Sequence, residues 1–431
     1  MKSSTLAAFL CLGACVCGDA FAAEVSIKGD VSQTLDASNN YFMTKSPSGI
    51  TGHALSNIDL DFLAATPTTQ YDLKTNYGYY KYFGPGAQDT PLTFGTTPGA
   101  TFTIDHVDAL TKYNFIASWQ RSDVATTSLA ETGNFAGRGT FDTYNVGGGF
   151  KRDLGAADTV SWSAQYSTVS FSDPTSTPYV DYTSNAGWNH RLSATTTLVT
   201  TLNFDWLMVD NPADSQRLYW NPMAGVQSQL TKRLFFYGTA GFGFVNAYQN
   251  GSATPTGTFQ QNVGATNGWL GNFNLNYQVF HDTNASLTAT RAISPTVTGQ
   301  LLDIESVALS LNHTINNRSS ASLFAQFSQT ATAATPGVNA STSDFFSASA
   351  SYAYAIAREW RSSVSYTYSQ RIDITGLVRS SAVSLTLTHD FTLFGKPPTE
   401  IQKTQSDIAQ QDLGRAQRAL PTVGVLPTYA Q

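Results

Sequence analysis

The sequence predicts an all-β chain that closes into a transmembrane, antiparallel up-and-down β-barrel of about 18 strands, with 16 as the alternative number. Three observations predict this fold. Apolar and polar residues alternate along many long segments, and the spacers between those segments alternate between long and short. Charged residues make up only 13% of the chain, against a usual share of about 25%.

The stretch "SAVSLTLTHDFTLF", residues 381–394, shows the alternation most clearly. Val383, Leu385 and Leu387 share one parity, while Ser384 and Thr386 share the other, which is the period-2 pattern of a strand with one apolar face. The pattern lasts about twice as long as an ordinary strand of roughly 5–6 residues. We expect the apolar face to meet lipid, where an unpaired strand edge finds no hydrogen-bond partner, so the sheet must close on itself.

The first 22 residues predict a signal peptide. Lys2 precedes an apolar run, and Ala20 and Ala22 are small residues at the positions that a signal peptidase reads. A lipoprotein signal with Cys15 as the first mature residue is the alternative. All three cysteines lie within this segment, so the mature chain would have no disulfide and no cysteine-bound metal. No later run of about 18 apolar residues predicts a transmembrane helix.

Alternation of parity places the expected strands in order along the chain. They fall near residues 25–35, 55–65, 70–82, 101–109, 113–120, 141–150, 158–171, 179–190, 196–208, 217–229, 234–248, 267–280, 285–292, 305–314, 319–329, 344–356, 361–370 and 381–394.

The spacers separate the two ends of the expected barrel. Tight connections such as "TPTT" and "LTKR" alternate with long ones such as residues 36–52 and 83–99. In an outer-membrane barrel the tight turns face the periplasm and the long loops face outward. A β-sandwich does not require this asymmetry, and a propeller or solenoid would show a sequence repeat at a fixed period, which is absent.

Tryptophan positions predict two girdles at the depth of the lipid headgroups. Relative to the ends of the expected strands, one group of tryptophans lies near the long-loop end (Trp119, Trp206, Trp220, Trp269) and the other near the short-turn end (Trp162, Trp188, Trp360).

Three features carry a resemblance to a known family: the strand rhythm, the tryptophan girdles and the aromatic strand end at Phe394. In these features residues 23–394 resemble the porin-like outer-membrane β-barrel proteins of Gram-negative bacteria. Residues 55–82 also resemble the β-barrel porins found beside exopolysaccharide export genes. The resemblance implies export through the periplasm after signal-peptide cleavage, insertion by the outer-membrane insertion machinery, and contact with outer-membrane lipid and lipopolysaccharide.

Residues 395–431 depart from that pattern, because in most such barrels a Phe is the last residue. The segment is rich in Gln, and its apolar residues have a loosely helical spacing between Pro398 and Pro421. We expect a periplasmic tail that is partly helical or disordered and is a candidate contact for a periplasmic partner.

The parity opposite to the lipid-facing one predicts the residues that line the pore. The predicted set is mostly acidic and consists of Lys28, Asp30, Asp59, Asp61, Asp72, Lys74, Asp105, Asp205, Asn274, Asn276 and Asp390. Charge on a confined wall raises the local concentration of counter-ions, so the pore is expected to prefer cations or neutral solutes mildly.

These features predict a passive channel for small hydrophilic solutes, narrowed by residues 36–52 or 83–99 folding inward. No catalytic residue, metal site or cofactor is predicted, and nothing in the net charge of −6 suggests nucleic acid. Two alternatives remain. One is a structural or export-partner barrel in exopolysaccharide secretion, and the other is an outer-membrane hydrolase that uses His53, the one histidine near the long-loop end.

Overall fold

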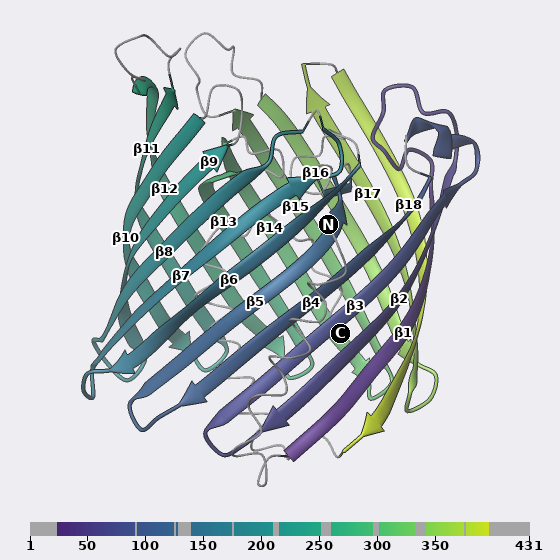
Figure 1. Ribbon diagram of the computed structural model, residues 1–431. Coiled ribbons are helices and arrows are strands. Elements are labelled where there is room, and N and C mark those ends of the chain that lie inside the picture. The colour runs from purple at the N-terminus through teal and green to yellow at the C-terminus, as the bar shows by residue number, and fades with distance from the viewer. Residues whose placement is uncertain are drawn as a thin grey trace, which may run out of the picture.

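In the computed structural model, 18 antiparallel strands form one closed barrel (Figure 1). The structure describes residues 24–90, 93–124, 126–127, 139–174, 176–209, 215–250, 260–295, 301–332, 342–374 and 376–395. The predicted fold class and the larger of the two predicted strand numbers are therefore confirmed. The predicted signal peptide at residues 1–22, and all but the first residue of the predicted tail at 395–431, lie outside the described residues.

The strands follow one another around the barrel in chain order. The first nine are β1 (Glu24–Ser38), β2 (Thr51–Ala65), β3 (Thr69–Phe83), β4 (Phe94–Val107), β5 (Thr111–Asp123), β6 (Thr140–Asp153), β7 (Asp158–Phe171), β8 (Tyr179–Arg191) and β9 (Thr196–Val209). The second nine are β10 (Ser215–Thr231), β11 (Leu234–Asn250), β12 (Gln260–Phe280), β13 (Thr283–Pro295), β14 (Leu301–Asn316), β15 (Ser319–Thr332), β16 (Thr342–Ala355), β17 (Trp360–Asp373) and β18 (Gly376–Phe394).

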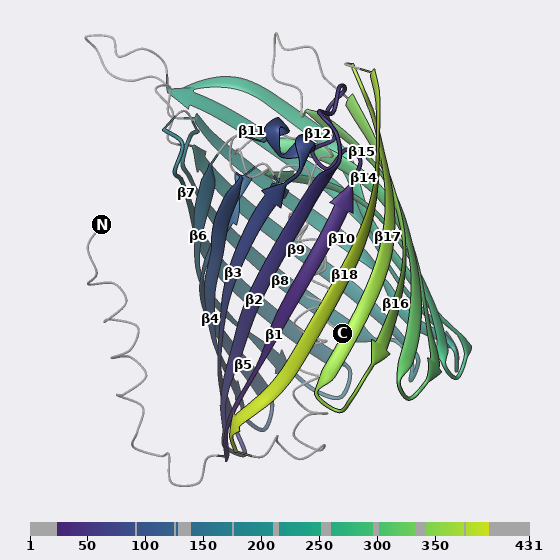
Figure 2. The ribbon, with the colours of Figure 1, turned by 90° about the vertical axis from the view of Figure 1, so that its right-hand side faces the viewer.

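The barrel closes where β1 pairs with both β2 and β18, and Figure 2 shows β1 between these two strands. Asp30 lies opposite Asp390 on one side and opposite Asp59 on the other, in a register that is regular except at a shift between Ile27 and Lys28. Each strand therefore has two hydrogen-bonded neighbours, and no backbone edge is left open to the surroundings.

The connections differ in length at the two ends of the barrel, as predicted. At the short-turn end they range from two residues, such as 232–233, to four, such as 154–157. At the long-loop end they reach 16 residues, at 124–139. The connection at residues 374–375 is the exception, because only two residues join β17 to β18 there, and Gly376, the first residue of β18, has a φ of 114°.

Several strands extend beyond the predicted limits. β4 begins at Phe94 rather than near residue 101, because residues 94–99 continue the pairing with β3 even though Pro98 lies among them. β12 begins at Gln260 rather than near 267, and it continues the ladder with β11. Local alternation is weak in these Gly- and Thr-rich stretches, where the neighbouring strand fixes the conformation instead.

Helical structure is sparse in the described part of the chain. A short 3₁₀ helix, η2 (Pro85–Asp89), lies in the connection between β3 and β4. No helix among the described residues is long and apolar enough to cross a membrane.

Candidate functional site: the lumen of the barrel

The two faces of the sheet differ in crowding and in chemistry, and this identifies the lumen. Side chains on the concave face of a barrel converge, while those on the convex face diverge. Buried polar residues such as Asp72, Asn203 and Asn221 share one face, whereas highly exposed apolar residues such as Val31 and Leu385 share the other. The first face is the lumen wall, and the second is the outer wall.

All 11 residues of the predicted pore-lining set lie on the lumen face. The pairing register joins them in short rows: Lys28 lies opposite Asp61, Asp61 opposite Lys74, and Asp59 opposite Asn76. Asn76 on β3 and Asn203 on β9 also occupy inward-facing positions of their strands. That these side chains line a conducting pore stays a prediction.

One side of the lumen, formed by β17, β18 and β1–β3, carries a dense group of charges. Arg361 donates to Asp390 at 2.7 Å, and Lys74 lies 3.2 Å from Asp72. Asp30 stands between Asp390 and Asp59 in the ladder, with no cation between these three carboxylates in the row. Acidic groups therefore outnumber basic ones in this part of the wall.

The predicted set omitted several charged residues of the same face. Six basic and five acidic residues of inward parity are missing from it: Lys112, Lys151, Arg191, Arg217, Arg361, Arg371, Glu24, Asp36, Asp153, Asp181 and Asp373. All of them follow the inward parity of their strands, so the alternation that predicted the others could have found them. Their inclusion makes the acidic surplus smaller than the sequence analysis indicated.

The neighbouring part of the lumen wall, on β13–β17, is dominated by small hydroxyl side chains. Cross-strand hydroxyl pairs join neighbouring strands, with Ser286 and Ser310 at 2.7 Å and Thr290 and Ser306 at 2.6 Å. Ser322 and Ser351 form a further pair at 2.5 Å. These side chains are short, so this wall leaves room in the lumen while it presents donors and acceptors to water.

A row of amides continues the polar lining on β8–β10. Asn185 donates to Asn203, Asn203 donates to Asn221 at 2.5 Å, and Asn221 donates to the Tyr219 hydroxyl at 2.6 Å. Asn203 and Asn221 each donate one hydrogen bond and accept another in this row, which fixes the orientation of both amides.

At the long-loop end, two connections fold together against the inner face of β2 and β3. Phe42, which is only 1% exposed, packs against Tyr80, Tyr82 and Ala87, and we name these four residues the rim cluster. Ser48 in one connection donates to Asp89 in the other at 2.5 Å. Both segments that were candidates for narrowing the pore therefore take part in this packing, through their loops at residues 39–50 and 84–93.

His53 belongs to this rim and not to a free loop. Its ring stacks on Tyr82 at 4.8 Å, and its Nδ1 lies 2.8 Å from Asp36 Oδ2. Nearby in the loop, burial raises the pKa of Tyr41, and the charge of Asp36 adds to that shift. Such an environment fits an anchor for the loop. The described residues contain no group of three or more His, Cys, Asp or Glu side chains that could hold a metal ion.

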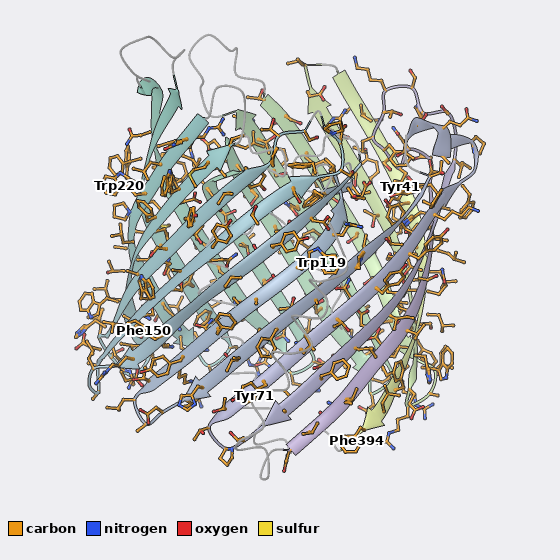
Figure 3. The ribbon with its side chains drawn as sticks, viewed as in Figure 1. Tyr41, Tyr71, Trp119, Phe150, Trp220 and Phe394 are labelled. Atoms are coloured by element: carbon orange, nitrogen blue, oxygen red, sulfur yellow. The ribbon has the colours of Figure 1, made fainter. Side chains whose placement is uncertain are left out.

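The outer wall has the chemistry of a surface solvated by lipid. Large apolar side chains are exposed along it, and all seven tryptophans face outward. Figure 3 shows Trp220 toward the long-loop end and Tyr71 and Phe394 toward the other. Trp269 differs from its prediction, since it lies near the middle of β12, a strand that begins earlier than expected.

A closed 18-stranded barrel with a polar lumen and an apolar outer wall defines the class: this is the architecture of a porin-like outer-membrane β-barrel. No sequence-family model and no curated protein matches the chain.

Among solved structures, three outer-membrane proteins are similar at a distance. The copper transporter OprC has a TM-score of 0.46 and 12% identity, and the match covers 81% of this chain and 62% of that one. OccAB2 of Acinetobacter baumannii has a TM-score of 0.46 and 8% identity, over 86% of this chain and 98% of that one. A BenF-like porin of Pseudomonas fluorescens has a TM-score of 0.44 and 11% identity, over 86% and 99%. These likenesses concern the fold alone.

Proposed function

We propose that the protein is a passive channel of the outer membrane for small hydrophilic solutes, with a preference for neutral solutes and a mild preference for cations over anions. The observation that carries this proposal is the divided lining of the lumen. A wall of short hydroxyl side chains on β13–β17 adjoins a wall with an acidic surplus on β18 and β1–β3.

The hydroxyl wall supports the neutral preference. Serine and threonine hydroxyls can replace the hydration of an uncharged polar solute without the cost of stripping water from a charge. The row formed by Asp390, Asp30 and Asp59 supports the cation preference, because like charges on a confined wall attract counter-ions. Lipopolysaccharide and other outer-membrane lipids would surround the apolar outer wall.

Conductance across a planar bilayer tests the proposal directly. We expect discrete ion-conducting steps and a reversal potential in a salt gradient that indicates mild cation preference. In water, unit charges about 8 Å apart interact by about 0.5 kcal/mol. The loss of one carboxylate removes this attraction for a cation and this repulsion for an anion, so the cation-to-anion permeability ratio changes by about fivefold. Asp30→Asn and Asp59→Asn should each lower that ratio, and Arg361→Gln should raise it.

A charge removed from the outer wall provides the control. Asp344 lies on the outer face of β16, so Asp344→Asn should leave the permeability ratio unchanged. Anion preference in the unmodified protein would refute the proposed selectivity. A protein that inserts but never conducts, and that captures a periplasmic partner through residues 395–431, would instead support the export-partner alternative.

A further inference from the structure

The turns at the short-turn end of the barrel are joined into one continuous ring, which we name the turn ring. Each turn is hydrogen-bonded to the strand that follows its hairpin. The Arg233 carbonyl accepts from the Gln278 amide, and the Asp282 carbonyl accepts from the Thr314 amide, at 2.8 Å each. Neighbouring hairpins are two strands apart, which is about 10 Å. The backbone therefore holds adjacent turns at fixed places beside one another.

Basic residues occupy only one half of the turn ring. The four turns between β2 and β9, at residues 66–68, 108–110, 154–157 and 192–195, contain no Lys or Arg. The four turns between β10 and β17 contain four such residues, which we name the basic arc: Lys232, Arg233, Arg318 and Arg358. The same turns contain two carboxylates, Asp282 and Glu359, so this half of the ring keeps a net positive charge.

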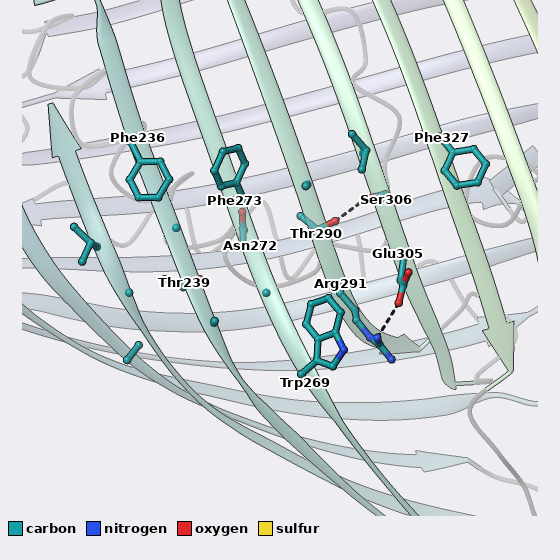
Figure 4. A pocket seen from close by; sticks show the side chains of 18 residues that line it. Phe236, Thr239, Trp269, Asn272, Phe273, Thr290, Arg291, Glu305, Ser306 and Phe327 are labelled. Carbon is teal, nitrogen blue, oxygen red and sulfur yellow. Dashed lines mark hydrogen bonds and ion pairs between the residues drawn. The ribbon is translucent and has the colours of Figure 1, made fainter. Parts of the chain in front are cut away.

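The basic arc has charge to offer to a ligand. All four of its residues are exposed, and none of them has a carboxylate partner in the part of the chain that the structure describes. Two basic residues of the outer wall at the long-loop end differ in this respect. Arg121 is held by Asp142. Arg291 lies between the Trp269 ring and Glu305, as Figure 4 shows.

The outer wall next to the basic arc carries two imidazole rings. His313 lies on the outer face of β14, and its Nδ1 is 2.8 Å from the Thr283 hydroxyl oxygen. When that hydroxyl donates to Nδ1, the ring carries its proton on Nε2 and can donate it to a ligand. His389, on the outer face of β18, stacks on Trp360 with the ring centroids 4.5 Å apart. The indole marks the depth of the lipid headgroups.

We propose that the turn ring from β10 to β17, together with this outer wall, binds an anionic glycerophospholipid of the periplasmic leaflet. The lipid phosphate lies beside Arg318 of the basic arc, and His313 Nε2 donates to one of its oxygens. The acyl chains lie along the apolar outer wall. The short-turn end faces the periplasm in an outer-membrane barrel, and basic clusters just outside the apolar region of a membrane attract anionic headgroups.

The position of the basic arc favours a lipid over an acidic periplasmic protein. The arc is continuous with the lipid-facing wall through His313, on the hairpin that carries Arg318, and through Trp360, which follows the turn that carries Arg358. A headgroup at the membrane surface contacts both parts at once. The surplus of basic residues over Asp282 and Glu359 favours a headgroup with a net negative charge over a zwitterionic one.

Native mass spectrometry of the full-length, detergent-solubilised barrel tests the proposal, with equal amounts of dioleoyl phosphatidylglycerol and dioleoyl phosphatidylethanolamine as probes. We expect the bound lipid to be enriched in phosphatidylglycerol. Lys232→Gln/Arg233→Gln and Arg318→Gln/Arg358→Gln should each lower the ratio of bound phosphatidylglycerol to phosphatidylethanolamine by about fivefold or more. Lys45→Gln/Arg379→Gln is the matched control, because it removes two exposed positive charges at the long-loop end, and it should leave the ratio unchanged.

His313→Phe tests the imidazole separately. It keeps an aromatic ring at the headgroup depth but removes the donor, and it should lower the same ratio by about twofold while circular dichroism shows a folded barrel.

Three outcomes would overturn the proposal. Equal binding of the two lipids by the unmodified protein, or an unchanged ratio in both variants of the basic arc, would refute the site. An equal fall in the control variant would show that lipid preference follows the net charge of the chain and not the turn ring. Binding of poly-L-glutamate in place of phosphatidylglycerol would show that the arc recognises an acidic protein instead.

Discussion

Some charged side chains on the lipid-facing wall are paired, and Asp142 is the clearest example. It accepts from Trp119 Nε1 at 3.1 Å and from Arg121 Nε and Nη2 at 3.0 and 2.8 Å. Both charges lie near the long-loop end of their strands, β5 and β6. A guanidinium that makes two hydrogen bonds to a carboxylate, which also accepts from an indole N–H, can stay at the headgroup depth at low cost.

Removal of Asp142 should therefore destabilise the barrel more than removal of the whole pair. Asp142→Ala leaves Arg121 without this carboxylate beside lipid, and we expect a loss of about 1 kcal/mol in the free energy of unfolding, a value kept small because the guanidinium is partly exposed. Denaturant unfolding in lipid vesicles measures it. The double variant Arg121→Met/Asp142→Ala should recover part of the loss, and a double variant that is less stable than Asp142→Ala would contradict this account.

Individual lumen residues were predictable because parity is a strict rule in a paired strand. Lys28, Asp61 and Lys74 were found from alternation alone, and their cross-strand neighbours then followed from the register. The hydrogen bonds between them were not predictable. The contact between Arg361 and Asp390 depends on how β17 and β18 are aligned with each other. Alternation within either strand does not determine that alignment.

At the scale of elements, the loops at residues 39–50 and 84–93 act as one unit. Phe42 sits between Tyr80 and Tyr82, and the backbone amide of Gly86 donates to the Ile50 carbonyl at 3.2 Å. The sequence left open which of the two segments narrows the mouth. The packing shows that neither segment is placed without the other, which no reading of one loop by itself could have revealed.

Phe42→Ala should release this pair of loops while leaving the strands paired. Truncation of a buried Phe to Ala lowers the free energy of unfolding of a packed core by about 3 kcal/mol. Here we expect it to destabilise the packing of the two loops and not the pairing of the strands. We expect faster cleavage by trypsin after Lys45 and larger fluctuations of the open-channel current. Ile50→Ala is the control, because Ile50 is 62% exposed in the same loop. Unchanged cleavage in Phe42→Ala would show that the loops are held by other contacts.

Strand limits were the least predictable feature of the elements. Residues 94–99 and 260–266 read as loop because their alternation is poor, yet they pair with β3 and β11. Where one neighbour already presents a complete row of backbone donors and acceptors, pairing does not require an apolar pattern.

At the scale of the whole molecule, closure depends on the seam between β1 and β18, which are the two ends of the barrel in the sequence. Ser32 lies opposite Thr388 at this seam, and Asp36 lies opposite Ser384. The fold class was predictable because lipid excludes open edges. The register at the seam was not, since no short turn connects these two strands.

Paired cysteines test that register. Directly opposite residues have Cα atoms about 4.5–5.5 Å apart, within the range that a disulfide spans. Ser32→Cys/Thr388→Cys should therefore form a cross-link that is visible as an altered migration on a denaturing gel. Ser32→Cys/Ser384→Cys is displaced by four residues, or about 13 Å, and should not cross-link. Efficient cross-linking of the displaced pair would show that the seam has a different register.

The even strand number has a practical consequence. Glu24 at the start of β1 and Phe394 at the end of β18 both lie at the short-turn end, while residues 39–50 lie at the opposite end. A tag placed ahead of Glu24 and an epitope inserted among residues 39–50 would mark opposite sides of a bilayer. Digestion from outside a sealed liposome would then reveal the vectorial orientation of each reconstituted molecule.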